Sequence, residues 1–185
     1  MDHPWRDALL PPDPRDHGAL LALNNVQTPA VNAIPMEELR QLLGWPGYHM
    51  VAHDDEGPAG FVVAIDGPGL DYPSDNYRWF SERYDHFLYV DRIAVHPRSH
   101  GLGYGSVLYA SAIAHAATAG YPVVLAEVNT RPPNEGSHRF HLRHGFTAVG
   151  EQETKGGSVR VRMYERRITP ADHPETPARP PRVQN

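Results

Sequence analysis

The stretch HPRSHGLGYGSVLY (His96–Tyr109) is the part of this sequence that decides how the chain folds. It follows the run FLYVDRIAV (Phe87–Val95) and leads into the apolar run SVLYASAIAHAAT (Ser106–Thr118). Runs of β-branched and aromatic residues favour strands, and a longer apolar run after a turn favours a helix. The order therefore predicts a strand, a glycine-rich turn and the start of a helix.

Three alternate glycines shape the predicted turn, namely Gly101, Gly103 and Gly105. Because they carry no side chains, backbone N–H groups of the turn can approach a ligand closely. The first turn of the following helix adds N–H donors without intrahelical partners and the positive end of the helix dipole. This combination predicts an anion site, and the ligand that suits it best is a phosphate or a pyrophosphate.

Two common glycine-rich phosphate sites fit these residues poorly. A P-loop needs a lysine and a Ser or Thr after its last glycine, but the only lysine of the chain is Lys155. A dinucleotide-binding turn needs Gly-x-Gly-x-x-Gly, whereas these glycines are spaced Gly-x-Gly-x-Gly. Glu127 lies 22 residues after Gly105, where a ribose-binding acid belongs, so a dinucleotide-binding oxidoreductase stays an alternative. A purely structural glycine turn is another.

The segment resembles the acetyl-CoA loop of the GNAT superfamily of N-acetyltransferases. That loop follows the pattern Val-x-Pro-x-x-[Arg/Gln]-Gly-x-Gly-[aliphatic]-Gly-x-x-Leu. The corresponding residues of this chain are Val95, Pro97, His100, Gly101, Gly103, Tyr104, Gly105 and Leu108. His100 replaces the usual Arg or Gln, Tyr104 replaces a small aliphatic residue, and Arg98 is a nearby cation that could assist. Neither replacement removes the backbone cradle.

The resemblance implies both a fold and a cosubstrate, acetyl-CoA. The fold is α/β (α+β), with a mixed, mostly antiparallel sheet, helices on both faces, and parallel fourth and fifth strands that splay apart. The resemblance is strongest over residues 87–150 and extends over 5–168. It implies that backbone groups of Ile93, Ala94 and Val95 pair with the pantetheine arm in the gap. The pyrophosphate would be held by the loop amides of His100, Gly101, Leu102, Gly103, Tyr104, Gly105 and Ser106.

A second segment, VVLAEVNTRPPNEGSHRFHLRHGF (Val123–Phe146), resembles the GNAT enzymes that acetylate protein N-termini. In those enzymes a strand ending Leu-x-Glu-Val precedes an Asn and a later Leu-Tyr pair before Gly-Phe. Acetyl transfer to an amine needs a general base and a way to protonate the leaving thiolate. The match implies that Glu127 is the general base and that Asn134 contacts the cofactor, although the connection between them is two residues longer here.

His141 stands where the resembling enzymes carry a tyrosine whose phenol protonates or hydrogen-bonds the CoA sulfur. Imidazole has an ordinary pKa near neutrality, so one hypothesis makes His141 the general acid. The other hypothesis is a polar helix residue without a role in catalysis, because His138 and His144 flank it. Asp91 and Tyr89 are rivals for the base, and alternation along Phe87–Val95 places both of them on one face with Ile93.

Composition predicts one soluble domain over residues 1–168. The 185 residues are 40% hydrophobic, the formal net charge is −5, and there is no Lys/Arg-rich block, which argues against nucleic-acid binding. Zero cysteines exclude disulfides, thiolate zinc sites and a cysteine nucleophile. The start lacks the pattern of a secretory signal and no apolar span could cross a membrane, so we expect a cytoplasmic protein. Residues 169–185 are predicted to be a disordered, Pro-rich tail.

Metal binding is not expected, although the chain holds twelve histidines. His138, His141 and His144 are three residues apart, whereas a helical zinc pair is usually four apart with a third ligand elsewhere. The sequence thus contains no convincing ligand set.

Periodicity and turn residues predict the remaining elements. We expect helices that reach Leu23, span Met36–Leu43, include Tyr77–Arg83, and cover Gly105–Ala119 and Gly136–His144. Expected strands are Trp5–Leu10, Tyr48–His53, Gly60–Ile65, Phe87–Val95, Pro122–Val128, Phe146–Glu151 and Val159–Arg166.

The sequence therefore predicts an enzyme that transfers an acetyl group from acetyl-CoA to a primary amine by direct attack in a ternary complex. The acceptor is an unidentified small molecule or protein terminus, and the resemblance allows a homodimer. Five aromatic residues between Tyr72 and Tyr84 would either form a wall that recognises the amine or pack a short helix into the core. A non-catalytic CoA-binding or regulatory module with the same fold is the alternative.

Overall fold

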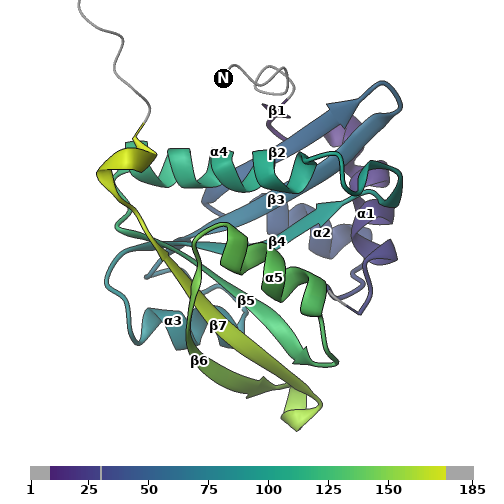
Figure 1. Cartoon of the computed structure of the whole chain (residues 1–185). Coiled ribbons are helices and arrows are strands. Elements are labelled where there is room, and N and C mark those ends of the chain that lie inside the picture. The colour runs from purple at the N-terminus through teal and green to yellow at the C-terminus, as the bar shows by residue number, and fades with distance from the viewer. Residues whose placement is uncertain (1–8, 30, 174–185) are drawn as a thin grey trace, which may run out of the picture.

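The computed structural model describes residues 9–29 and 31–173. Within them seven strands form one sheet in the order β1-β2-β3-β4-β5-β7-β6 (Figure 1). The strands are β1 (Leu9–Leu10), β2 (Gly47–Asp54), β3 (Gly57–Gly67), β4 (Phe87–Val95), β5 (Val123–Arg131), β6 (Thr147–Thr154) and β7 (Val159–Arg167). The α-helices are α1 (His17–Val26), α2 (Met36–Leu43), α3 (Asp75–Ser81), α4 (Tyr104–Ala119) and α5 (Glu135–Arg143). Short 3₁₀ turns connect several of these elements.

The pairing of β4 with β5 is the only parallel contact among the described strands, and it is short. It joins Leu88 to Val124, Tyr89 to Leu125 and Val90 to Ala126, and then stops. Beyond this point β4 stays paired with β3 and β5 stays paired with β7, so the two strands diverge (Figure 1). The predicted mixed sheet with splayed parallel strands is confirmed. A doubly wound dinucleotide-binding sheet, which needs several parallel neighbours, is excluded.

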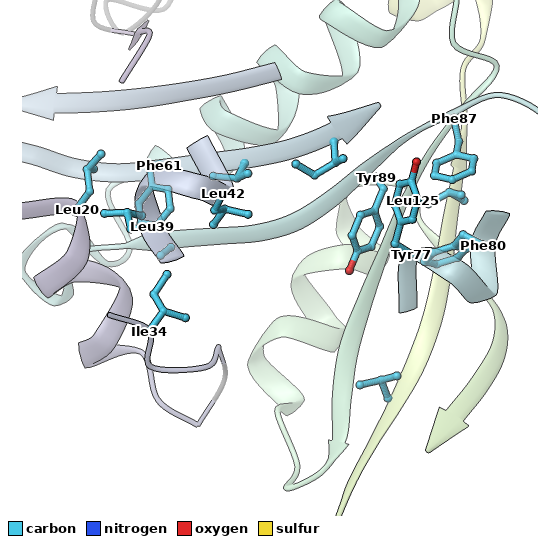
Figure 2. Close-up of a cluster of buried hydrophobic side chains, with 14 of the residues drawn as sticks. Leu20, Ile34, Leu39, Leu42, Phe61, Tyr77, Phe80, Phe87, Tyr89 and Leu125 are labelled. Atoms are coloured by element: carbon cyan, nitrogen blue, oxygen red, sulfur yellow. The ribbon is translucent and has the colours of Figure 1, made fainter. Parts of the chain in front are cut away.

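Helices cover both faces of the sheet, and each face has its own apolar core. On the first, called the α1–α3 face, Leu20 of α1, Leu39 of α2 and Phe80 of α3 pack on residues such as Phe61 and Leu125 (Figure 2). On the second, the α4–α5 face, α4 contributes Leu108, Tyr109 and Ile113, and Phe140 of α5 packs beside them. Alternation along a strand sends successive side chains to opposite faces, so neighbouring strand residues belong to different cores.

A β-bulge in β4 changes that alternation in the middle of the strand. Val63 pairs with Arg92 and Ala64 pairs with Val90, which leaves Asp91 without a partner on β3. Tyr89 and Ala94 consequently lie in the core of the α1–α3 face, whereas Ile93 packs against the other core. The prediction that Tyr89, Asp91 and Ile93 share one face is therefore wrong beyond the bulge, because one extra residue reverses the parity.

The aromatic segment before β4 forms the short helix α3, which starts with the Ser74 side chain accepting a hydrogen bond from Tyr77 N at 3.2 Å. Tyr77 and Phe80 are buried, and Trp79 lies over Gly150 of β6. Core packing is thus one function of this segment, as one of the two hypotheses predicts. The docking also places α3 against the end of the sheet formed by β5, β7 and β6 (Figure 1).

The ends of the chain are only partly described. Leu9 and Leu10 belong to β1, and the rest of the strand predicted from Trp5 lies outside the described residues. At the other end, Pro170–Asp172 form a capped 3₁₀ turn in which Asp172 pairs with Arg166, while the predicted tail from residue 174 on lies outside the described residues. In the described part, no helix has the length and apolar character needed to span a membrane.

Gly150 provides a test of how α3 is held. An added Cβ would lie 2.7 Å from Trp79 Cζ2, and overpacking of this kind costs about 1–3 kcal/mol. We expect Gly150→Ala to lower the free energy of unfolding by about that amount in urea titrations, and Trp79→Leu in the same chain to restore part of the loss. Gly18→Ala is the control: its Cβ meets nothing within 4 Å, so it should keep or raise the free energy of unfolding, because alanine favours the helix α1. An unchanged urea midpoint for Gly150→Ala would show that Trp79 is not seated on this residue.

Candidate active site

A cleft of about 750 Å³ opens where β4 and β5 separate. Its lining includes Tyr89 and Glu127 from the α1–α3 face, and Val90, Tyr109 and Ala126 from the α4–α5 face. Because residues of both faces border one cavity, the cleft passes through the sheet at the gap.

One rim of the cleft is formed by segments far apart in sequence. The loop between α1 and α2 crosses toward the turn between β6 and β7, where Lys155 Nζ donates to Asn32 Oδ1. The same loop is tied to β5, because Asn129 Nδ2 donates to Pro29 O at 3.1 Å. At its start, Gln27 Nε2 donates to Val95 O at the end of β4, so the loop joins the ends of the separated strands across the gap.

The glycine loop has the backbone form that the sequence predicts. Gly101 and Gly103 have φ values of +77° and +92°, a conformation that side chains disfavour, and α4 begins directly after Gly103. Val107 N donates to Gly103 O at 3.1 Å, so helical bonding begins there. Gly105 faces α5, because a Cβ on it would lie 3.2 Å from Phe140 Cζ. Residues 94–106 are not part of the cleft lining, so the loop lies beyond it, after the end of β4.

The two candidate cations of the loop are both engaged within the protein. Arg98 pairs with Asp54 of β2, the NH2 group lying 2.9 Å from Oδ1. This pair braces the loop against the β2–β3 hairpin. The His100 ring donates from Nε2 to Val95 O at 2.9 Å, and Gln27 Nε2 donates to the same oxygen at 3.0 Å.

Alternate residues of β4 direct their backbone N–H and C=O groups toward β3 or toward the gap. His96 N donates to Ala59 O on β3 at 2.7 Å, so the backbone groups of Ala94, two residues earlier, also point to β3. Ile93 and Val95 point the other way, into the gap. Of the three residues predicted to pair with a pantetheine arm, Ile93 and Val95 have the required orientation and Ala94 does not.

Asn134 borders the cleft and begins α5. Its Oδ1 accepts a hydrogen bond from Ser137 N at 3.2 Å, which is the usual N-cap contact. The N-cap contact uses only the side-chain oxygen of Asn134, so its side-chain NH2 group can still contact a cofactor.

Glu127 follows Ala126, the last residue of β5 that pairs with β4, and faces the cleft from the α1–α3 side. Its Oε1 accepts hydrogen bonds from Asn76 Nδ2 at 2.9 Å and from Tyr89 Oη at 3.0 Å. Oε2 is buried and has no hydrogen-bond partner among the described residues. Burial is the main reason why the pKa of Glu127 is raised to about 8, and the charge of Asp91 adds to it. The two hydrogen bonds and the charge of Arg92 act in the opposite direction.

Asp91 borders the same cleft, but both of its oxygens are occupied. Tyr72 Oη donates to Oδ1 at 2.5 Å, and Arg92 Nε lies 2.7 Å from Oδ2. Arg92 also donates to Asn24 Oδ1 at 2.9 Å, and Asn24 in turn holds Asn32 O, so the network supports the loop between α1 and α2. Of the two carboxylates, only Glu127 presents an unbonded oxygen.

Comparison with known proteins agrees with this geometry. Residues 19–146, more than half of the chain, match the model of the acetyltransferase (GNAT) family. The chain belongs to the GNAT acetyltransferase family. This confirms the resemblance seen in the sequence and makes the protein an N-acetyltransferase by family, with acetyl-CoA as the family's cosubstrate. No curated protein matches the sequence.

Solved structures of acetyltransferases share the fold of this GNAT protein. Naa20 from Chaetomium thermophilum, in complex with a bisubstrate analogue, has 18% identity and a TM-score of 0.68, covering 86% of each chain. The ribosomal-protein-alanine N-acetyltransferase from Brucella melitensis has 22% identity and a TM-score of 0.63, covering 86% of this chain and 99% of its own. A GNAT acetyltransferase from Streptococcus pneumoniae, at 22% identity and TM-score 0.63, covers 87% of this chain and 98% of its own.

His141 of this acetyltransferase is buried and neutral. Its Nδ1 lies 2.8 Å from Ser137 O, and because a carbonyl can only accept, Nδ1 carries the ring proton. Nε2 then accepts from Tyr109 Oη, 2.7 Å away. Burial lowers the pKa of His141 to about 4, so the ring holds no second proton at neutral pH. The position borders the cleft as predicted, but the ring is occupied on both sides.

The neighbouring histidines are also held by contacts within the protein. His138 bonds to Tyr164 Oη and Asn129 O, and His144 Nδ1 donates to Phe140 O. Among residues 9–29 and 31–173, no group of three or more His, Asp or Glu side chains is arranged to hold a metal ion.

Sequence reasoning missed the residues that hold Glu127. Asn76 was only part of a predicted aromatic segment, and Gln152 of β6 was not singled out, although its Nε2 donates to Asn76 Oδ1 at 3.0 Å. Tyr89 was named only as a rival to the base and proves to be its hydrogen-bond donor. No local pattern marks Asn76 or Gln152, because their contacts join strands and helices far apart in the chain.

Burial of Glu127 makes the stability of the fold depend on pH. Since its pKa rises from an ordinary value of 4.5 to about 8, the folded protein keeps a proton that the unfolded chain has lost between these values. This contribution to stability is complete below the lower value and is lost as pH rises through the upper one. We therefore expect the free energy of unfolding to fall over this range relative to Glu127→Gln, measured by urea titration at several pH values. For Glu153→Gln, at an exposed glutamate of β6, the curve of unfolding free energy against pH should run parallel to that of the wild type. Parallel curves for Glu127→Gln as well would contradict the buried, protonated carboxyl.

Proposed function

We propose that this acetyltransferase transfers the acetyl group of acetyl-CoA directly to a primary amine in a ternary complex, with Glu127 as general base. The observation that carries the proposal is the buried, unbonded Oε2 of Glu127 at the point where the cleft crosses the sheet. A pKa of about 8 suits a group that must take a proton from an amine near neutral pH.

The residues of the cofactor side fit acetyl-CoA, which supplies an activated thioester. The positive-φ glycine loop and the start of α4 present backbone amides to the pyrophosphate at Gly101, Gly103, Tyr104, Gly105 and Ser106. The amides of His100 and Leu102, which the sequence also assigned to it, donate within the loop to Pro97 O at 3.2 Å and to Ser99 O at 3.4 Å. The outward backbone groups of Ile93 and Val95 pair with the pantetheine arm, and Asn134 contacts it from α5. Binding in this way displaces Gln27 and His100 from Val95 O.

The acceptor reaches the gap from the α1–α3 face, where Glu127 lies. The amine nitrogen attacks the acetyl carbonyl carbon while Glu127 Oε2 takes a proton from the nitrogen. The carbon–sulfur bond then breaks and the sulfur leaves as a thiolate. Asp91 does not compete for the proton, because Tyr72 and Arg92 occupy both of its oxygens. Its role is to hold Arg92 and the loop between α1 and α2.

The thiolate does not receive its proton from His141 in this proposal, which replaces the general-acid hypothesis. The single ring proton is donated to Ser137 O, and the pKa of about 4 leaves no imidazolium at neutral pH. His141 instead accepts the hydrogen bond of Tyr109 and forms part of the cleft wall. A CoA thiolate is a fair leaving group, so solvent suffices to protonate it.

The walls of the acceptor side suit a cationic amine. Trp45 and Tyr72 meet edge to face at 5.4 Å between ring centroids, and both border the cleft. Glu38 and Asp75 border it as well. Aromatic faces and carboxylates both attract ammonium groups before the amine is deprotonated.

Removal of the base tests the chemical step. We expect Glu127→Gln to lower kcat by about a hundredfold or more, because general bases contribute at least that much, while the Kd for acetyl-CoA stays near the wild-type value. Turnover is followed as free thiol with a panel of amines, and binding by calorimetry. In Asp91→Asn the midpoint of the pH–rate profile should move to lower pH, since the charge of Asp91 raises the pKa of Glu127. Full activity of Glu127→Gln would refute this base, and coenzyme A binding without turnover of any amine by the wild type would favour a CoA-binding module.

A charge placed at the start of α4 tests the pyrophosphate site. Ser106 is exposed in the first turn, where an acidic residue stabilises a helix but repels a bound anion. We expect Ser106→Asp to keep or raise Tm and to weaken coenzyme A binding about tenfold or more, as two charges of like sign meet at close range. Ser106→Asn, which adds no charge, is the control. Equal affinities of the two variants would place the pyrophosphate elsewhere.

A further inference from the structure

The two oxygens of the Glu127 carboxyl have different surroundings. Oε1 receives two hydrogen bonds, one from Asn76 on α3 at 2.9 Å and one from Tyr89 on β4 at 3.0 Å. Oε2 receives none from the described residues, although it is buried. A carboxylate held by donors at one oxygen takes a proton at the other, so Oε2 is the oxygen left to take a proton.

The donor from α3 depends on which way the Asn76 amide is turned. An asparagine amide has a donor end and an acceptor end, and the wrong orientation would set its oxygen against the carboxylate. Gln152 Nε2 donates to Asn76 Oδ1 at 3.0 Å. Because the oxygen end is engaged by Gln152, the nitrogen end faces Glu127.

Both side chains are supplied by elements that the fold locks together. Trp79 of α3 sits over Gly150 of β6, two residues before Gln152, and Tyr77 and Phe80 anchor the same helix in the core. The docking of α3 on β6 therefore brings Asn76 between Gln152 and the base.

We propose that Gln152 and Asn76 form a positioning relay, in which Gln152 sets the orientation of the Asn76 amide and Asn76 fixes Oε1 of Glu127, so that Oε2 receives the proton of the acceptor amine. The inference rests on the proposed function of Glu127 as base. Neither Asn76 nor Gln152 is assigned contact with the reacting atoms.

The relay also influences when Glu127 loses its proton. The charged groups around the carboxyl are Asp91, which raises its pKa, and Arg92, which lowers it. The hydroxyls of Tyr72, Tyr89 and Tyr109 are the other titratable groups close enough to interact with it. The hydrogen bond from Asn76 stabilises the charged form, so its loss raises the pKa of Glu127.

The experiment compares pH profiles of kcat/KM for Asn76→Ala, Gln152→Met and Gln152→Glu with one acceptor, so that the titration of the acceptor itself is common to all. A hydrogen bond to a charged group is worth enough to move a pKa by about one unit. Asn76→Ala should therefore shift the midpoint upward by about one pH unit and be about tenfold slower at pH 7, with the rate recovering at high pH. Gln152→Met, which removes the donor but keeps the shape, should shift it less. Glu82→Gln, at the exposed C-terminal end of α3 and outside the cleft lining, is the matched control and should leave the profile unchanged.

Gln152→Glu makes the test specific to the relay. A carboxylate at this position attracts the Asn76 nitrogen and turns the amide oxygen toward Glu127, which should raise the midpoint at least as far as Asn76→Ala does. The added charge alone would act with or without Asn76, so the double variant Asn76→Ala/Gln152→Glu separates the two causes. We expect most of the Gln152→Glu shift to disappear in the Asn76→Ala background. A shift that persists there in full would overturn the relay, as would a uniform loss of rate at every pH in Asn76→Ala.

A direct titration separates this inference from the function on which it rests. Carbon-13 NMR of the labelled Glu127 carboxyl, assigned with Glu127→Gln, reports its pKa in the unliganded protein without any turnover. A higher midpoint in Asn76→Ala supports the relay even if Glu127→Gln proves active, and the latter result would refute only the base. An unchanged midpoint in Asn76→Ala overturns the relay even if Glu127 is the base.

Discussion

The structure depends on the early end of the pairing between β4 and β5. Each strand keeps its other neighbour, so past Val90 and Ala126 the two inner edges carry backbone groups without a sheet partner. Such groups are costly when buried, and in this chain Val95 O is satisfied by Gln27 and His100. The separation opens the cleft, links the two faces of the sheet and leaves Glu127 next to the last paired residue. The glycine loop, Glu127 and the aromatic residues of the cleft are all arranged around this one interruption.

Two carboxylates at the gap show how surroundings can divide roles between similar groups. Asp91 has an arginine and a tyrosine hydroxyl at its oxygens, whereas Glu127 has neutral donors at one oxygen only. The nearby charge of Asp91 and the burial of Glu127 both disfavour the ionised form of Glu127. The β-bulge contributes to this arrangement, because it leaves Asp91 without a partner on β3.

The helices and strands were predictable from the sequence because their signals are local, and the family resemblance supplied the splayed parallel pair of strands. Apolar periodicity gave β4 with its observed bounds, and Gly44 and Gly120 mark the ends of α2 and α4. The glycine loop could be located because its motif occupies a few consecutive residues. Glu127 could be located because it lies near the end of a predicted strand. The β-bulge in β4 could not be predicted, since it depends on how β4 pairs with β3. Asn76 and Gln152 could not either, because their hydrogen bonds join residues 51 and 76 positions apart. His141 was found, but its role depends on Tyr109, which α4 supplies from 32 positions away.

An enzyme that acylates amines works in the presence of its own side-chain amines. This chain has a single lysine, Lys155, and its ε-amino group is bonded to Asn32 at the rim of the cleft. Arginine takes nearly every other cationic position, and guanidinium is a poor nucleophile because it stays protonated. Chemical labelling of lysines would therefore report on one location, the rim of the cleft, and protection of that label would register whatever occupies it.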